Sequence, residues 1–265
     1  MNPGDIILHH PLTRVFLAES QRRLMDGGIG VFAYHYLGDP APHGPDPYLY
    51  LTSGRFRSQL SLLRDSGYST ITLSGLAASC RDGKLPHGRV VISIDDGARN
   101  FFDGGMGILA EHGFHAIQFL VAGRIGGINE WDAKHGHPVV SLMDDGQIRE
   151  WLAEGHEIGS HSMTHRNLSR LDAAEARRQI MDSKKQLEDQ FGVPVRHFCY
   201  PHGRFNAATV ALVEEAGYET ACTTCFGVNG PGQHPYELKR MFPLSGREFL
   251  GKIFHRVCRR VGVSQ

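Results

Sequence analysis

Two pairs of residues in this chain have the types and spacing to bind a metal ion and activate water. Asp95 and Asp96 are adjacent in the stretch SIDDG, and His161 and His165 stand four residues apart in HSMTH. Two neutral imidazoles and one carboxylate form a common ligand set for catalytic zinc, with positions left open for water and substrate. The other carboxylate would then act as a general base. Together these residues favour hydrolysis of an amide or an ester.

Each pair also has an ordinary structural explanation. Asp-Asp-Gly is favourable turn chemistry at the end of a strand. The hydroxyl groups of Ser160, Ser162 and Thr164 can organise a turn around the histidines without a metal. The chain has 16 histidines, so pairs at this spacing also arise by chance. No Glu follows His161, and the HExxH pattern of metalloproteases is therefore absent.

Strands alternate with helices along the chain, and the polar clusters follow the predicted strands. The β-branched run RVVISI before Asp95 is typical of a strand buried on both faces. Helical patterns with short connections separate the strands, which favours parallel βαβ units in an open sheet or a barrel. In such folds ligands bind at the carboxyl ends of the strands. The residues expected at those ends are His35, Asp95, Asp96, His161, Pro201 and His202.

The ordered motifs resemble those of the polysaccharide deacetylases, the NodB-homology carbohydrate esterases. SIDDG resembles the first motif of that family, with Ile94 in place of a phenylalanine, and HSMTH resembles the second. YPHG, at 200–203, resembles the third. The segments WLAEGHEIGSHSMTHRNL and EEAGYETACTT also follow in the family's order, and the resemblance extends over roughly residues 30–245.

The resemblance implies a distorted (β/α) barrel that binds one divalent metal ion, usually zinc, with cobalt and nickel as alternatives. By motif position, Asp95 resembles the general base, and the metal ligands would be Asp96, His161 and His165. The third motif implies that Tyr200, Pro201 and His202 bind substrate. There the backbone N–H of His202 would help to hold the tetrahedral oxyanion.

Two departures from the family pattern concern the catalytic groups. Cys199 occupies the position of an arginine that orients the base in many members. Arg240 resembles a late arginine of one subgroup and would take over that task, although Arg196 is also near in sequence. The late Leu-x-His motif, which carries the general acid, is missing. His35, in an early Tyr-His pair, fits the subgroup in which the acid lies on an early strand, and a core or capping histidine is the alternative.

The sequence predicts one α/β catalytic domain at 28–245, after an N-terminal extension at 1–27. The C-terminal segment 246–265 has the pattern of a basic amphipathic helix, which either packs on the barrel or contacts an anionic membrane surface.

A formal net charge of zero gives no indication of nucleic-acid binding. The amino-terminal residues lack a signal-peptide pattern, so the expected location is the cytoplasm, or its inner membrane surface if the C-terminal helix binds lipid. The oligomeric state is not indicated.

Five cysteines, an odd number, do not form a disulfide framework. Cys222 and Cys225 form a CxxC, but Gly, Asn and Pro follow it instead of the helix that a redox motif requires.

The functional prediction then rests on the four candidate metal-site residues and the family resemblance, which together predict an N-deacetylase acting on an N-acetylated amino sugar in a carbohydrate. The alternatives are a deformylase or other amidohydrolase of a lipid-linked or cyclic amide, and an inactive carbohydrate-binding protein. The intact acidic and histidine residues argue against the last.

Overall fold

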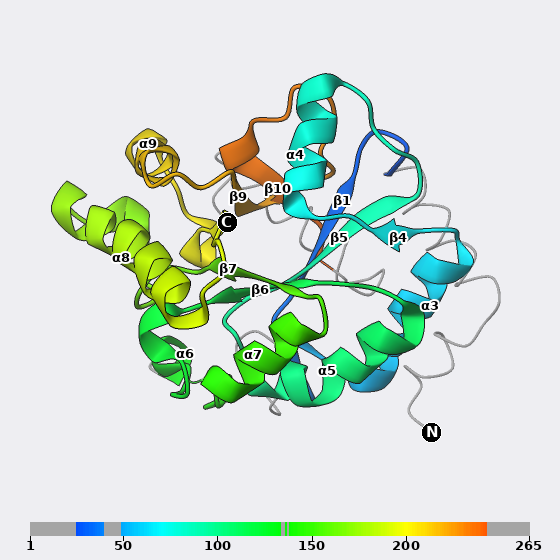
Figure 1. Cartoon of the computed structure of the whole chain (residues 1–265), viewed down its shortest axis with the longest axis horizontal. Coiled ribbons are helices and arrows are strands. Elements are labelled where there is room, and N and C mark those ends of the chain that lie inside the picture. Colours follow the sequence, from blue (N-terminus) through cyan, green and yellow to red (C-terminus); the bar gives the residue numbers. More distant parts are fainter. Residues whose placement is uncertain (1–24, 40–48, 134–135, 137, 243–265) are drawn as a thin grey trace, which may run out of the picture.

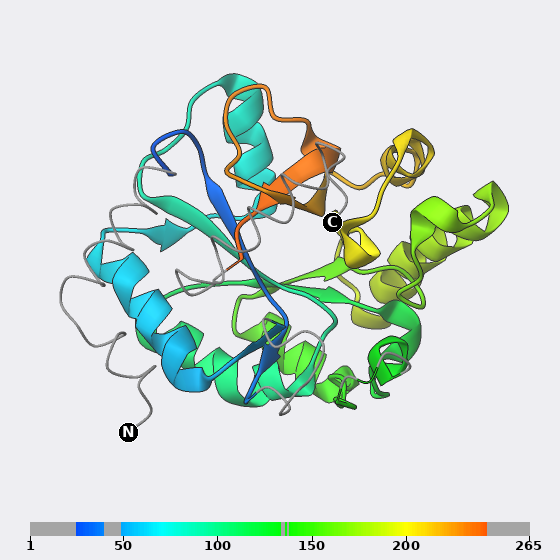
Figure 2. The same cartoon turned by 180° about the vertical axis from the view of Figure 1, so that it is seen from behind.

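Parallel strands curl into a nearly closed barrel in this computed structural model, which describes residues 25–39, 49–133, 136 and 138–242 (Figures 1 and 2). The strands are β1 (Gly30–Tyr34), β2 (Tyr36–Leu37), β3 (Tyr50–Leu51), β4 (Ser69–Thr70), β5 (Arg89–Ile94), β6 (Ile117–Leu120), β7 (Glu157–Ser160), β8 (His197–Cys199), β9 (Thr220–Phe226) and β10 (Leu238–Arg240). The main sheet has the order β1-β5-β6-β7-β8-β9-β10, with β4 beside β5, and β2 pairs with β3 separately.

The two edges of this order meet through the residue that follows β10. Met241 N–H donates to the carbonyl of Val31 at 2.7 Å, and Ala33 N–H donates to the carbonyl of Met241 at 2.9 Å. Every pairing between strands is parallel in the described part of the chain. The predicted distorted (β/α) barrel is therefore confirmed, and the carboxyl ends of its strands share one rim.

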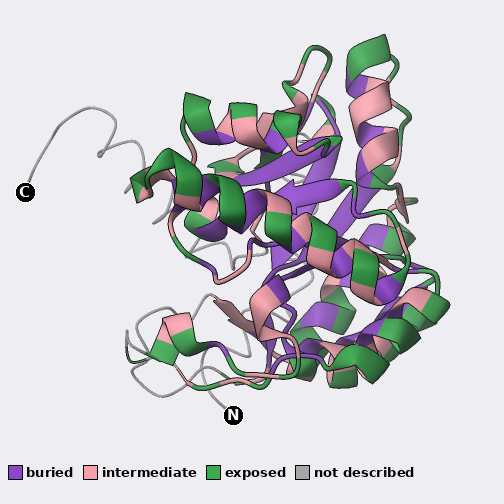
Figure 3. Cartoon of the chain, turned by 60° about the vertical axis from the view of Figure 1, so that its left-hand side comes forward, coloured by how far each residue is buried: buried purple, intermediate pink, exposed green. Residues whose placement is uncertain are grey.

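Helices cover the outside of the strands, with their outer faces exposed and the strands buried (Figure 3). The helices are α3 (Ser53–Asp65), α4 (Leu73–Asp82), α5 (Arg99–His112), α6 (Glu130–Ala133), α7 (Asp145–Ala153), α8 (Ala173–Phe191) and α9 (Ala207–Glu215), with short 3-10 turns η2 (Ala122–Arg124), η3 (Leu168–Arg170), η4 (Pro201–Gly203) and η5 (Pro235–Glu237). Helix α4 was not predicted from the sequence. The Thr72 side chain starts this helix by accepting from Gly75 N–H.

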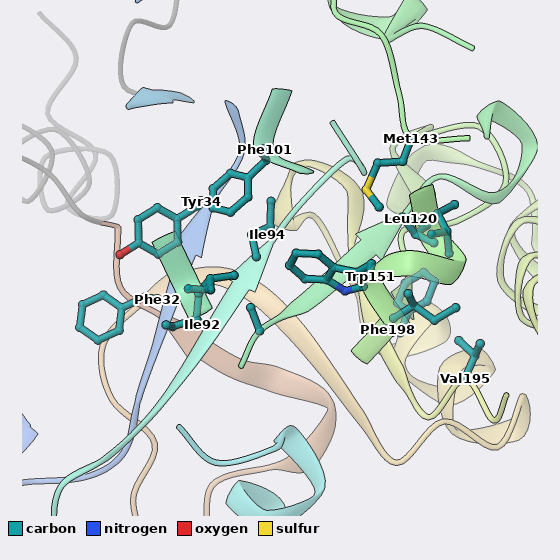
Figure 4. Packing of buried hydrophobic residues seen from close by; sticks show 14 of the residues in the cluster. Phe32, Tyr34, Ile92, Ile94, Phe101, Leu120, Met143, Trp151, Val195 and Phe198 are labelled. Carbon is teal, nitrogen blue, oxygen red and sulfur yellow. The ribbon is translucent and has the colours of Figure 1, made fainter. Parts of the chain in front are cut away.

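Buried side chains fill both faces of the strands. On β5, Ile92 and Ile94 belong to one apolar cluster and Val91 to another, so successive residues serve opposite faces. Figure 4 shows the larger cluster, in which Trp151 and Phe198 pack between strands and helices. The Trp151 indole N–H donates to the carbonyl of Glu157 at 2.9 Å. This packing on both faces fixes the strand ends that carry the polar residues.

Several sequence predictions concern residues that the structure does not describe or that lie away from the rim. Residues 1–24 of the N-terminal extension and the basic helix over 246–265 lie outside the described residues. Among the helices that are described, none is long and apolar enough to cross a membrane. Cys222 is buried and Cys225 exposed on strand β9, so this CxxC does not begin a helix.

His197, at the start of β8, should make folding stability depend on pH. Burial lowers the pKa of this imidazole to about 4, and its Nδ1 lies 2.9 Å from the Thr220 hydroxyl. In the unfolded chain this imidazole binds a proton below about pH 6.5, whereas in the folded protein it stays neutral down to about pH 4. The free energy of unfolding is therefore highest above pH 6.5 and decreases as the pH falls towards 4. We expect His197→Gln to reduce the slope of unfolding free energy against pH in this window, by at most about 1.4 kcal/mol per pH unit. Urea unfolding at several pH values checks this, and identical slopes would contradict it.

Candidate active site

Five strands deliver the sequence-predicted residues to one rim of the barrel. The ends of these strands carry His35 (β1), Asp95 and Asp96 (β5), His161 and His165 (β7), Tyr200, Pro201 and His202 (β8), and Arg240 (β10). Asp95, Asp96, His161, His165 and Arg240 are buried, each less than a tenth exposed. The rim therefore holds a charged and titratable cluster inside the protein.

Asp96, His161 and His165 bring one ligand atom each to within 4.8 Å of the others. Asp96 Oδ1 lies 3.6 Å from His161 Nε2 and 3.4 Å from His165 Nε2. Tetrahedral zinc, with bonds of about 2.0–2.1 Å, places its ligand atoms about 3.3–3.4 Å apart. Asp96 Oδ1 is buried and makes no hydrogen bond within the described residues. The spacing and this unpartnered oxygen fit a divalent metal ion, and we call the three residues the candidate metal triad.

Both histidines of the triad are held neutral, as metal ligands must be. His161 Nδ1 lies 2.7 Å from the carbonyl of Cys199, so Nδ1 carries the hydrogen and Nε2 keeps a free lone pair. Burial lowers the pKa of His161 to about 4. Burial, followed by the neighbouring His161 and His202, lowers the pKa of His165 well below its usual range. The two imidazoles are therefore available as ligands near neutral pH.

Tyr36 fixes the orientation of the carboxylate in the triad. Its hydroxyl lies 2.7 Å from Asp96 Oδ2 and also 2.7 Å from Asp132 Oδ2, and the residue is buried. Oδ2 is thereby occupied, and Oδ1 is left to face the histidines. Burial, with Asp132 and Asp95 close by, raises the pKa of Asp96 well above its usual range. A cation at Oδ1 would oppose these effects, which again fits a metal.

Sequence reasoning did not single out Tyr36, Asp132 or Trp131. The Trp131 ring stacks on His165 with a centroid distance of 4.5 Å, and the Trp131 indole N–H is buried without a hydrogen-bond partner in the described part of the chain. Tyr36 directly follows His35, so its place in the stretch YHYL was the one available signal. Asp132 and Trp131, on α6, carry no motif that links them to the rim.

Arg240 holds Asp95 through two hydrogen bonds. Its Nη1 donates to Oδ1 and its Nη2 to Oδ2, both at 2.7 Å. Burial raises the pKa of Asp95, but the Arg240 guanidinium outweighs burial, and the net effect is a pKa well below the usual range. Cys199 Sγ lies 3.7 Å from Oδ2. Arg196 instead pairs with Glu219 at 2.8 Å on the surface. Of the two candidate arginines, Arg240 is the one that contacts Asp95.

His35 also lies beside Asp95, on the side of the cluster that solvent reaches. Its Nε2 is 3.6 Å from Asp95 Oδ2, and its side chain is 17% exposed. This position differs from that of a core histidine, because the ring borders both the buried carboxylate and the solvent. A histidine here can exchange protons with solvent and with a group bound at the rim.

The third motif places only His202 at the surface of the rim. The Tyr200 and Pro201 side chains are buried, and the Tyr200 ring packs against Phe198 and Phe205. The side chain of Tyr200 is thus part of the core and does not face the rim. Gly203 completes the turn with φ of 63°, where an added Cβ would lie 2.2 Å from the Thr224 hydroxyl oxygen. This tight turn fixes the backbone around His202.

Backbone strain in the described residues is concentrated at this rim. The non-glycine residues with positive φ are Asp96 (74°), Ser162 (69°), His165 (58°) and His202 (57°). Such conformations cost of order 1–3 kcal/mol each and persist where the surrounding structure enforces them, as at active sites and ligand clamps. Two of the four belong to the candidate metal triad.

A cavity of about 570 Å³ opens beside the triad. Trp131, His165 and His202 form one part of its lining. The volume lies in the range of small-molecule sites, which is about 300–1,000 Å³. The described rim therefore combines a metal-binding geometry, an ionised carboxylate and a space for a ligand.

Comparison with known proteins identifies the family. The model of the family described as polysaccharide deacetylase matches residues 82–221, and this chain belongs to that family. The resemblance seen in the motifs is thereby confirmed. YxkH of Bacillus subtilis strain 168 is 28% identical over 187 residues, which cover 70% of this chain and 63% of YxkH. The peptidoglycan-N-acetylglucosamine deacetylase of Bacillus cereus is 37% identical over 73 residues, 28% of this chain and 34% of that relative.

The chain thus spans less than two thirds of the length of these relatives. Among solved structures, the Streptococcus pyogenes deacetylase PplD in complex with acetate superposes with a TM-score of 0.69 at 20% identity. The match covers 85% of this chain and 97% of the PplD chain. At this identity the likeness establishes a shared fold, and the roles of individual residues rest on the geometry described above.

Replacing Tyr36 with Phe should weaken metal binding by about 10- to 100-fold, because the variant loses the hydrogen bond that orients Asp96. Tyr50→Phe is the matched control. The Tyr50 hydroxyl is buried and makes no hydrogen bond within the described residues, and its ring packs 5.0 Å from that of Tyr36. Competition with a chromogenic chelator measures both affinities. Equal values for Tyr36→Phe and Tyr50→Phe would show that the hydrogen bond does not support the ligand.

Proposed function

We propose that this chain is a metal-dependent hydrolase that removes N-acetyl groups from an amino sugar in a glycan or glycan precursor. The observation that carries the proposal is the pairing of two sites: the candidate metal triad, and an ionised Asp95 held by Arg240 at its side. Family membership supports the reaction class. The relative from Bacillus cereus named above supports an N-acetylated amino sugar as the substrate class.

We infer that the metal is zinc. Two imidazole nitrogens and one carboxylate oxygen suit zinc, and cobalt or nickel can occupy a site of this kind. When bound, such an ion lowers the pKa of its water from about 16 to about 7 and polarises a carbonyl. His161 and His165 offer neutral nitrogens, and Asp96 supplies the negative charge.

The residues of the chain then have separate tasks in amide hydrolysis. Asp95 accepts a proton from the attacking water, and Arg240 keeps its carboxylate ionised and aimed. The backbone N–H of His202 binds the oxyanion that develops at the carbonyl carbon. His35 donates a proton to the nitrogen as the C–N bond breaks. The products are acetate and a free amine on the sugar. The buried Asp95 carboxylate and the partly exposed His35 match a base and an acid with different access to solvent.

Acetate release is the direct test. The purified protein, loaded with zinc, is incubated with N-acetylglucosamine oligomers and with their N-formyl counterparts. We expect acetate release that a chelator abolishes and zinc restores, with formate release slower. Faster formate release would favour the deformylase alternative. Binding of the oligomers without release of either acid, from a metal-loaded protein, would favour the inactive carbohydrate-binding protein.

A further inference from the structure

The cavity beside the candidate metal triad has a lining of two chemical kinds. Trp131, His165 and His202 belong to the site already described. The other part carries three arginines, Arg124, Arg166 and Arg170, which we call the arginine wall. The mechanism of amide hydrolysis uses none of these arginines.

The arginine wall comes from the segments that follow two neighbouring strands, β6 and β7. Arg124 ends η2, which follows β6, and Arg170 ends η3, after the histidine motif. Arg166 directly follows the metal ligand His165. Three cationic side chains are thus placed next to the triad, Arg124 after the end of β6 and Arg166 and Arg170 in the segment that follows β7.

Protein carboxylates neutralise this wall only in part. Glu130 lines the cavity and pairs with Arg124 at 3.1 Å. Arg166 contacts Glu175 at 3.2 Å, but Glu175 also accepts hydrogen bonds from Arg178 and Gln179. The Arg170 guanidinium has no hydrogen-bond or ion-pair partner among the described residues. The cavity therefore keeps an excess of positive charge.

We propose that the arginine wall binds an anionic group of the substrate, a carboxylate or a phosphate, carried by the amino sugar or by the next residue of the glycan. This inference rests on the proposed function, because it assumes that the N-acetyl group lies at the triad. Guanidinium groups match the planar oxygen pairs of carboxylates and phosphates, and their bonds to anions are stronger than neutral hydrogen bonds. A neutral N-acetylated homopolymer is accordingly not the preferred substrate.

The test compares anionic and neutral probes by steady-state acetate release. Hyaluronan tetrasaccharide, with a carboxylate on the neighbouring sugar, is paired with chitotetraose. N-acetylglucosamine 6-phosphate is paired with N-acetylglucosamine. For each pair we expect the wild-type protein to have the higher kcat/KM on the anionic member. In the double variant Arg166→Gln/Arg170→Gln the anionic-to-neutral ratio should fall about tenfold or more.

Arg64→Gln/Arg81→Gln is the charge-matched control. These two exposed arginines lie in the last turns of α3 and α4, do not line the cavity and should leave the ratio unchanged. A loss confined to the hyaluronan pair assigns a carboxylate, and one confined to the phosphate pair assigns a phosphate. An equal ratio in the wild type and the double variant for both pairs overturns the inference.

A failure of the proposed function can be distinguished from a failure of the anion site. If the metal-loaded wild-type protein releases acetate from no probe, titration calorimetry with the two anionic probes decides the arginine wall separately. Binding that Arg166→Gln/Arg170→Gln weakens about tenfold retains the anion site without the deacetylase. Absence of binding, or equal binding by the wild type and the double variant, rejects the anion site.

Discussion

Asp95→Asn should lower kcat for N-acetyl hydrolysis by about 10²- to 10⁴-fold, the usual contribution of a general base. The asparagine keeps the shape of the side chain but cannot accept the proton from water. Metal content should stay near that of the wild type, because Asp95 is outside the candidate metal triad. Steady-state kinetics and metal analysis on the same preparation measure both quantities.

Glu219→Gln is the matched control for Asp95→Asn. Glu219 is also a carboxylate paired with an arginine, but that pair with Arg196 is on the surface. Its loss should leave kcat near that of the wild type, because Glu219 directly precedes β9 and its ion pair is on the surface, outside the candidate site. A wild-type kcat in folded, metal-loaded Asp95→Asn would rule out Asp95 as the base.

Arg240→Met should lower the unfolding free energy by about 3–5 kcal/mol, because it leaves the buried Asp95 carboxylate without its partner. The double variant Arg240→Met/Asp95→Asn should lose clearly less than the sum of the two single losses, with a coupling of about 0.5–3 kcal/mol. Urea unfolding at neutral pH measures all three variants. Strictly additive losses would contradict the direct pairing.

The same substitution has a kinetic signature that a purely structural role would not give. Without the guanidinium, burial is left to raise the pKa of Asp95. In Arg240→Met the base should therefore become protonated at a higher pH, and the acid limb of the pH–rate profile should move upward. Arg196→Met is the control, because its exposed partner Glu219 lies outside the site. A shift of the acid limb in Arg196→Met alone would make Arg196 the orienting arginine.

The residues that could be predicted from the sequence are those that follow recognisable strands. The β-branched run of β5 indicated where Asp95 and Asp96 would emerge, and parallel topology then implied that other strand ends would share their rim. Arg240 could be tied to Asp95 only through family resemblance, because 145 residues separate the two. Arg196 shows the opposite: it is near the third motif in sequence, but in the structure it pairs with Glu219 at the surface.

The supporting contacts around the triad could not be predicted. Tyr36 meets Asp96 across 60 residues and Asp132 across 96, and no periodicity or motif joins these positions. The arginine wall is similar, since Arg124 and Arg170 become neighbours of one cavity only when β6 and β7 pair. Helix α4 was also not predicted, although the Thr72 cap and the buried Leu73 and Leu76 are ordinary signals of a helix.

Metal content of the zinc-loaded, tag-free protein, measured by mass spectrometry beside the double variant Asp96→Ala/His161→Ala, tests the central claim most directly. We expect about one ion per wild-type chain and almost none in the folded variant, because a site that loses two of three ligands no longer holds zinc. No bound metal in the wild type after supplying zinc, cobalt or nickel would contradict the account. It would mean that the two histidines form a structural turn and that the rim binds a ligand without metal chemistry.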